Sequence, residues 1–169
     1  MARAVQDLPP FAGHSPDQER PLGGYAALMA TFAAAVAGFS GWVRASGREL
    51  PDRPSLGDLA LVTIATHKAS RLLAKDRVTS TVRAPFTEFE DDAGPGEVSE
   101  RARGHGLRRA IGELIICPYC LGLWIAAAFA AGLVVAPRLA RWVAGVLTAV
   151  SGSDVLQMAY KKAEDNVRG

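Results

Sequence analysis

Two long apolar runs limit what this chain can fold into. They cover residues 22–43 and 111–135, and Glu113 is the one charged residue within them. At about 1.5 Å of rise per helical residue, each run is long enough to cross a hydrocarbon core about 30 Å thick. A soluble helical bundle is the alternative, but the helices of such a bundle keep a polar face, and these runs leave little room for one. We therefore predict two membrane-spanning helices here.

Two further runs, residues 56–73 and 139–160, are shorter or more polar. Polar residues interrupt both: His67, Lys68 and Arg71 in the first, and Ser151, Ser153 and Asp154 in the second. Ser55 is placed to cap the first of these helices. The predicted fold class is all-α, a helical membrane bundle with four transmembrane helices.

The polar segments divide the chain around this bundle. Residues 1–21 are rich in proline and are expected to form a disordered cytoplasmic tail. The transmembrane helical domain is residues 22–160, and 161–169 is a second cytoplasmic tail. Between the second and third helices, residues 76–108 hold an acidic and then a basic stretch around Gly94-Pro95-Gly96, which predicts a flexible hydrophilic loop.

Charge placement predicts the orientation. With a cytoplasmic N-terminus, the inner segments carry twelve Lys and Arg residues and the outer turns five, which are Arg44, Arg48, Arg53, Arg138 and Arg141. This split places both termini in the cytoplasm and the protein in the cell membrane. The net charge of +2 is small, and no basic stripe is interleaved with aromatic residues, so nucleic acid is not an expected partner. The expected partners are the lipid bilayer and either a second copy of the chain or other membrane helices.

The two cysteines stand inside the third apolar run, as Cys117-Pro118-Tyr119-Cys120. Proline suits the first position of a helix, so Cys117 is expected at a helix start. An offset of three residues brings Cys120 to the same face, where the pair can form a disulfide, share a metal or pack side by side. Because this part of the chain is expected on the cytoplasmic side, where thiols stay reduced, we predict a pair that is close but not obligatorily bridged.

Helical rise places several polar side chains at one depth in the cytoplasmic half of the bundle. The predicted polar cluster contains His67, Lys68, Arg71, Glu113 and Asp154, beside the candidate thiols Cys117 and Cys120. Glu113 is the expected ion-pair partner of Arg71 or Lys68, and Asp154 is expected near Cys117 or His67. Two plainer interpretations remain open: His67 and Arg71 reach the headgroups, or the cluster is a set of ordinary interhelical hydrogen bonds.

Some of these residues carry a resemblance. Lys68, Arg71, Asp76, Thr79, Arg83 and Pro85-Phe86, followed by Glu113, Cys117-Pro-x-Cys120, Gly122 and Trp124, resemble a family of short bacterial integral membrane proteins catalogued as a domain of unknown function. The similarity covers residues 56–160 and implies an integral membrane protein with the cysteine turn, without an activity, substrate or cofactor. Cys117-Pro-Tyr-Cys120 also matches the dithiol motif of glutaredoxins, but no strand-helix-strand pattern surrounds it.

Three functions follow from these observations. The favoured one is a structural or accessory membrane protein that is not an enzyme and needs no cofactor. The second is a membrane thiol-redox protein with Cys117 as the attacking thiolate and Cys120 as the resolving thiol. The third is metal binding or transport, with Cys117, Cys120 and His67 as candidate ligands.

Overall fold

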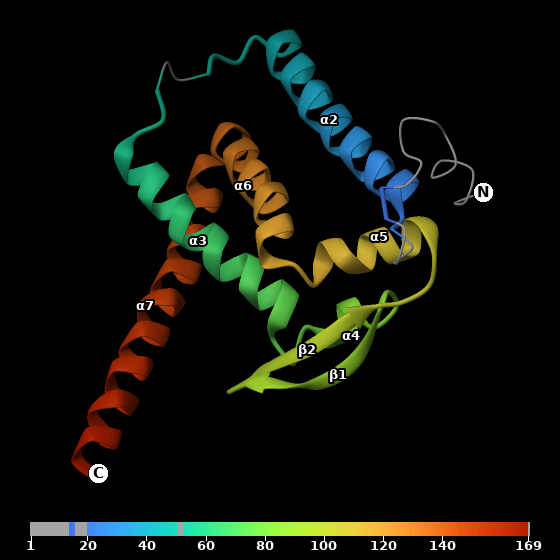
Figure 1. Cartoon of the computed structure of the whole chain (residues 1–169). Coiled ribbons are helices and arrows are strands. Elements are labelled where there is room, and N and C mark those ends of the chain that lie inside the picture. Colours follow the sequence, from blue (N-terminus) through green and yellow to red (C-terminus); the bar gives the residue numbers. More distant parts are fainter. Residues whose placement is uncertain (1–13, 16–19, 51–52, 169) are drawn as a thin grey trace. The chain divides into compact units, whose positions relative to one another are not determined.

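The computed structural model describes residues 14–15, 20–50 and 53–168, and most of the predicted N-terminal tail lies outside them. The chain divides into two compact units, Met1–Glu49 with Arg71–Leu121, and Leu50–Ser70 with Gly122–Gly169. Helices α3 (Leu56–Lys75) and α6 (Pro118–Val135) each contribute to both units (Figure 1).

The first unit contains a small β-hairpin. Besides parts of α3 and α6, this unit holds the hairpin strands β1 (Thr87–Gly94) and β2 (Glu97–Ala102). Its helices are α2 (Leu22–Ala45), α4 (Ser80–Arg83) and α5 (Gly106–Ile115). Strands β1 and β2 are antiparallel and form a two-stranded sheet, with a turn in which Gly94 and Gly96 have φ of 148° and 76°. Only glycine adopts such angles without strain, which accounts for the Gly94-Pro95-Gly96 sequence of the turn.

The hairpin corrects two predictions. The fold is mainly helical but not all-α, and residues 76–108 are folded as α4, β1, β2 and the start of α5 instead of forming a flexible loop. The polar composition of this stretch conceals its core, because a buried ion pair occupies the place that apolar side chains take in most strands.

Helix α5 lies between α2 and the hairpin, and two glycines permit the close approach. A Cβ added to Gly24 of α2 would lie 2.6 Å from the Cβ of Ala110, and one added to Gly112 of α5 would lie 2.5 Å from the carbonyl oxygen of Phe86. Both glycines are therefore required by packing, since no larger side chain fits at either contact.

The predicted third span is interrupted. Helix α5 ends at Ile115, and α6 begins at Pro118, so residues 111–135 are not one continuous helix. Proline lacks the N–H that a continuing helix would need at this position, and it starts the new helix instead. The predicted helix start at Cys117 is thus confirmed, and the first five residues of the predicted span belong to a separate helix.

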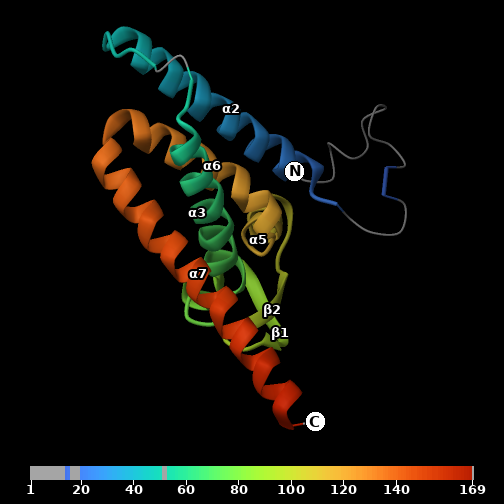
Figure 2. The same cartoon turned by 90° about the vertical axis from the view of Figure 1, so that its left-hand side faces the viewer.

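The second unit packs α3 and α6 with α7 (Pro137–Arg168). Asp58, Leu61 and Lys68 of α3 contact Arg141, Thr148 and Asp154 of α7, respectively. Because the partners advance together along both helices, α3 and α7 point in the same general direction (Figure 2). The predicted cap of α3 is confirmed, since Ser55 Oγ accepts a hydrogen bond of 3.0 Å from the Asp58 amide.

Three helices of the described chain are long and apolar enough to cross a membrane: α2, α6 and α7. Helix α3 forms as predicted but is not among them, because its polar residues lower its apolar content. Helix α7 continues to Arg168, so the described part of the predicted C-terminal tail is helical. A bundle of four membrane-spanning helices therefore remains a proposal.

Candidate functional site

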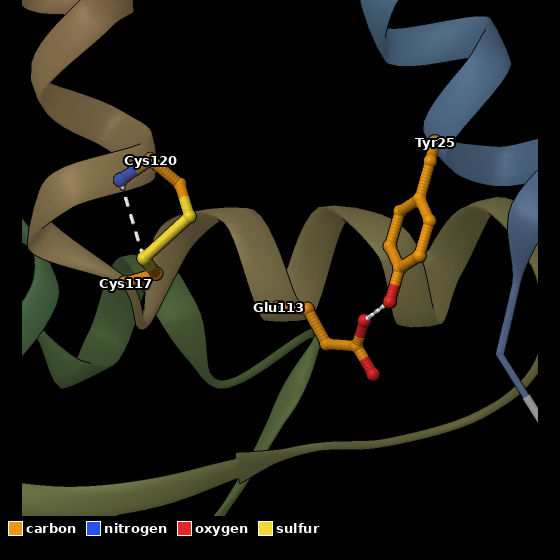
Figure 3. Close-up of a disulfide and its surroundings, with 4 residues drawn as sticks. All are labelled: Tyr25, Glu113, Cys117 and Cys120. Carbon is orange, nitrogen blue, oxygen red and sulfur yellow. Dashed lines mark hydrogen bonds between the residues drawn. A yellow bond between two sulfur atoms is a disulfide. The ribbon is translucent and has the colours of Figure 1, made fainter. Parts of the chain in front are cut away.

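Cys117 and Cys120 lie at the break between α5 and α6 and form a disulfide, with 5.3 Å between their Cα atoms (Figure 3). Cys117 precedes the helix, and its sulfur accepts a hydrogen bond of 3.2 Å from the Cys120 amide. Cys117 therefore acts as the helix cap, which satisfies an N–H group that lacks a partner within the helix. The predicted closeness of the pair is confirmed, and the pair is bridged, which the prediction had not required.

The bridge forms because Cys117 stands outside the regular helix, where its backbone can turn the side chain toward Cys120. Cys120 is exposed, and Tyr119 between the two cysteines is 94% exposed. Chemically, such a disulfide can be opened by an external thiolate.

Glu113 joins α5 to α2. Tyr25 Oη donates a hydrogen bond to Glu113 Oε2, and Arg109 Nε donates to Glu113 Oε1 at 3.0 Å. Figure 3 shows the Glu113 carboxylate directed toward Tyr25 and away from the disulfide. Arg71 or Lys68 was the expected partner. Arg109 and Tyr25 take that place, because Arg109 is one helical turn away on α5 and Tyr25 faces Glu113 from α2.

Arg71 instead binds the hairpin. Its Nε and Nη2 atoms contact the Glu97 carboxylate at 3.0 and 2.6 Å, in an exposed pair at the first residue of β2. Arg71 therefore connects the last turns of α3 to the sheet, and it is not paired with a residue of the third predicted span.

Lys68 and Asp154 pair with each other in the second unit, at 2.5 Å between Nζ and Oδ2. Asp154 was expected near Cys117 or His67. Its observed partner is Lys68, the residue that follows His67 in the chain. The hydrogen bond observed for His67 is at its backbone, where the carbonyl oxygen accepts from Ser70 Oγ at 3.0 Å.

The residues of the predicted polar cluster are thus divided between the units. Arg71, Glu113 and both cysteines belong to the first unit, and His67, Lys68 and Asp154 to the second. Their assembly into one cluster stays a prediction. Within the described residues, no three His, Cys, Asp or Glu side chains are grouped so that they could hold a metal ion.

Arg83 is the residue that the sequence analysis left without a role. It is 1% exposed, and its guanidinium binds Glu100 through Nε at 2.8 Å and Nη2 at 3.1 Å. It also donates to the carbonyl oxygens of Leu73 and Asp76 and to the hydroxyls of Thr79 and Ser80. A single side chain thereby holds the end of α3, the short helix α4 and strand β2 together.

The neighbouring polar residues complete this arrangement. Thr79 Oγ1 donates to the Leu72 carbonyl at 2.6 Å, Thr87 Oγ1 donates to Glu100 at 3.0 Å, and the Asp76 carboxylate accepts from the Val78 amide. Asp76, Thr79 and Arg83 are among the residues that carry the family resemblance. That resemblance was the one signal in the sequence that marked them.

These features define a mainly helical protein with three helices apolar enough to cross a membrane, a disulfide at a helix start and a hairpin fastened to a helix end by a buried arginine. The chain belongs to the family described as "Protein of unknown function (DUF1360)", whose match covers residues 61–160. This agrees with the predicted resemblance to a bacterial domain-of-unknown-function family.

A curated relative supports the same assignment. The chain is 31% identical over 97 residues to a protein of Bacillus subtilis (strain 168) named "Sporulation protein YjcA", and the similarity covers 56% of this chain and 81% of the relative. No solved structure matches the chain.

Proposed function

We propose that the protein is an accessory membrane protein whose helices α2, α3, α6 and α7 cross the cell membrane and hold a rigid platform at its cytoplasmic face. The platform consists of α4, β1 and β2. The N-terminal segment and the end of α7 lie on the same cytoplasmic side, in keeping with the distribution of Lys and Arg.

The pairing of α3 with α7 supports the fourth span. Lys68 pairs with Asp154, and Asp58 pairs with Arg141 at 2.8 Å. A charged side chain within a membrane is costly unless it has a partner, and these pairs supply one for each charge. The shared direction of α3 and α7 is also what the second and fourth spans of such a topology require.

The observation that carries the accessory role is the buried hydrogen-bond network of Arg83. It uses every N–H-bearing nitrogen of the guanidinium to connect the end of a helix to a hairpin. Such a network rigidifies its surroundings and leaves no free group for chemistry. The name of the Bacillus relative refers to a process, sporulation, and not to a reaction, which fits an accessory role in a process of that kind.

Single-cysteine labelling of intact cells tests the topology. In a background with Cys117→Ser and Cys120→Ser, Arg48→Cys should react with an impermeant maleimide from outside the cell. Phe89→Cys on β1, where the side chain is 64% exposed, should react only after the membrane is opened. Labelling of both positions from one side would remove α3 as a span and contradict the proposal.

A second function is favoured by one observation, the disulfide at the start of α6. A thiolate of a dithiol substrate would attack one sulfur of the pair, and the second substrate thiol would release the mixed disulfide. The products are the substrate disulfide and the reduced pair, so two electrons and two protons pass from the substrate to Cys117 and Cys120.

Stoichiometric oxidation of a dithiol peptide by the purified protein distinguishes this function from the accessory one. A redox protein should convert one peptide per chain, and the single variants Cys117→Ser and Cys120→Ser should each abolish the conversion. A disulfide that stays intact in the presence of the peptide would exclude exchange and leave the accessory role.

A further inference from the structure

We propose that α5 lies along the membrane surface on the platform side, where Arg103 and Arg108 bind the phosphate groups of anionic lipids. This inference rests on the proposed membrane location of α6, which begins three residues after α5 ends. It adds a lipid-binding surface next to the platform, formed by Arg103, which follows β2, and by Arg108 of α5.

Two guanidinium groups converge on one backbone oxygen. Arg108 donates to the Pro85 carbonyl through Nε at 3.0 Å and Nη2 at 2.7 Å, and Arg103 Nε approaches the same oxygen at 3.4 Å. The Arg108 side chain folds over Gly104, where an added Cβ would lie 3.0 Å from its Cδ. Backbone geometry therefore holds both cations in place.

This pair of like charges lacks a counter-charge within the described residues. The ion pairs of the platform engage other arginines: Arg77 with Asp92, Arg83 with Glu100, and Arg101 with Glu88. Neither Arg103 nor Arg108 has a carboxylate within 4.0 Å among the residues that the structure describes. Adjacent guanidinium groups that repel each other are stabilised by an anion, and the planar fork of arginine fits a phosphate.

The apolar face of α5 indicates that the bound phosphate belongs to a lipid headgroup and not to a soluble ligand or a nucleic acid. Leu107, Ile111 and Leu114 recur at helical spacing on one face, and Leu107 is 50% exposed directly beside Arg108. Ten residues extend about 15 Å, which is too short to cross a membrane but sufficient to lie along its surface. A soluble phosphate ligand or a nucleic acid would leave Leu107 in water, whereas a lipid leaflet accepts the leucine and the arginine together.

The position of α5 in the chain points to the same surface. Figure 3 shows the chain turning at Cys117 from α5 into the first turn of α6, the helix whose apolar length suits a membrane. Helix α5 also contacts α2 at Gly24 and the hairpin at Gly112. Helix α5 thus connects the start of a span with the folded platform.

Depth measurement tests the position of α5. Full-length protein with Cys117→Ser and Cys120→Ser carries a nitroxide at Leu107→Cys and is reconstituted in vesicles of phosphatidylcholine and phosphatidylglycerol. The label should collide with oxygen more than with a water-soluble nickel complex. The matched control is Phe89→Cys on β1, where the side chain is 64% exposed and should remain accessible to nickel. Equal nickel accessibility at both positions would overturn the inference.

Lipid selection tests the arginines. Replacing Arg103 and Arg108 with Gln should reduce the preference for phosphatidylglycerol over phosphatidylcholine by roughly fivefold for each arginine removed. The control variant, Arg77→Gln with Arg101→Gln, changes the net charge equally but removes guanidinium groups that already have carboxylate partners, so it should keep the preference. An equal loss in both variants would show a general charge effect and contradict the site.

Alkaline carbonate extraction of the vesicles, followed by flotation, distinguishes failure of the proposed function from failure of the present inference. A protein that is extracted from vesicles by alkaline carbonate fails the proposed function itself. A protein that resists extraction while Leu107→Cys stays in water fails only the present inference.

Discussion

Arg83 donates two hydrogen bonds to Glu100, at 2.8 and 3.1 Å, and the two side chains are only 1% and 5% exposed. The pair links α4 to β2 across 17 residues of sequence. Since the strands offer few buried apolar side chains, with Val98 the main one, the hairpin depends on this pair for its core.

Breaking the pair should unfold the hairpin locally. Arg83→Met or Glu100→Gln should lower the free energy of opening of the hairpin by roughly 3–5 kcal/mol, because each leaves a buried polar partner uncompensated. Hydrogen exchange of the β1 and β2 amides in the full-length protein measures the change. In the control Arg101→Gln, which removes an exposed pair with Glu88, the loss should stay below about 1 kcal/mol. Equal losses of opening free energy in the three variants would show that the buried Arg83–Glu100 pair is not what stabilises the hairpin.

The hairpin should lose stability in acid but not at neutral pH. Burial raises the pKa of Glu100, but hydrogen bonds from Arg83, Ser80 and Thr87 outweigh it and hold the pKa below its ordinary value of 4.5. A carboxyl with a lowered pKa in the folded state contributes stability that is complete above its unfolded pKa and is lost as pH falls through the folded one. Exchange protection should therefore stay constant from neutral pH down to about 5 and decline below the unfolded pKa. Glu100→Gln should remove the Glu100 contribution to this decline. A loss of exchange protection already near neutral pH would show that the titration of Glu100 does not cause it.

The Lys68–Asp154 pair should hold α3 against α7. Asp154→Asn leaves Lys68 without its partner and should weaken this contact by roughly 1–3 kcal/mol, the upper end applying if the pair lies deep in the membrane. Leu61→Cys and Thr148→Cys, placed where Thr148 Oγ1 lies 3.3 Å from the Leu61 carbonyl, report the contact through the yield of an oxidative cross-link in the cysteine-free background. Exchanging the charges, Lys68→Asp with Asp154→Lys, should restore the yield. An unchanged yield in Asp154→Asn would show that the pair does not stabilise the contact.

Gly112→Ala should separate α5 from the hairpin. The new methyl group would lie 2.5 Å from the Phe86 carbonyl oxygen and 2.8 Å from the Ala102 Cβ, and such overpacking costs about 1–3 kcal/mol. Thermal unfolding monitored by circular dichroism measures the loss. Gly145→Ala on α7 is the control, because nothing lies within 4 Å of the added methyl and alanine favours a helix more than glycine does. Similar melting temperatures for the two variants would show that the α5 contact tolerates displacement.

The sequence alone determined the parts of this protein that depend on neighbours along the chain. The apolar runs predicted where α2 and α6 lie, Pro118 predicted the helix start beside Cys117, and Ser55 predicted the cap of α3. Each of these signals is local, because helix formation and capping involve residues a few positions apart.

The tertiary structure decided the choices among distant partners. Arg71 selects Glu97, which is 26 residues away, and Asp154 selects Lys68, which is 86 residues away, although other carboxylates and cations were available to both. The hairpin was missed because its core is an ion pair, and a charged residue in a sequence does not reveal whether a partner will enclose it. Ion pairing has no sequence period, and it is decided only when the folded backbone brings the charges together and removes water from around them.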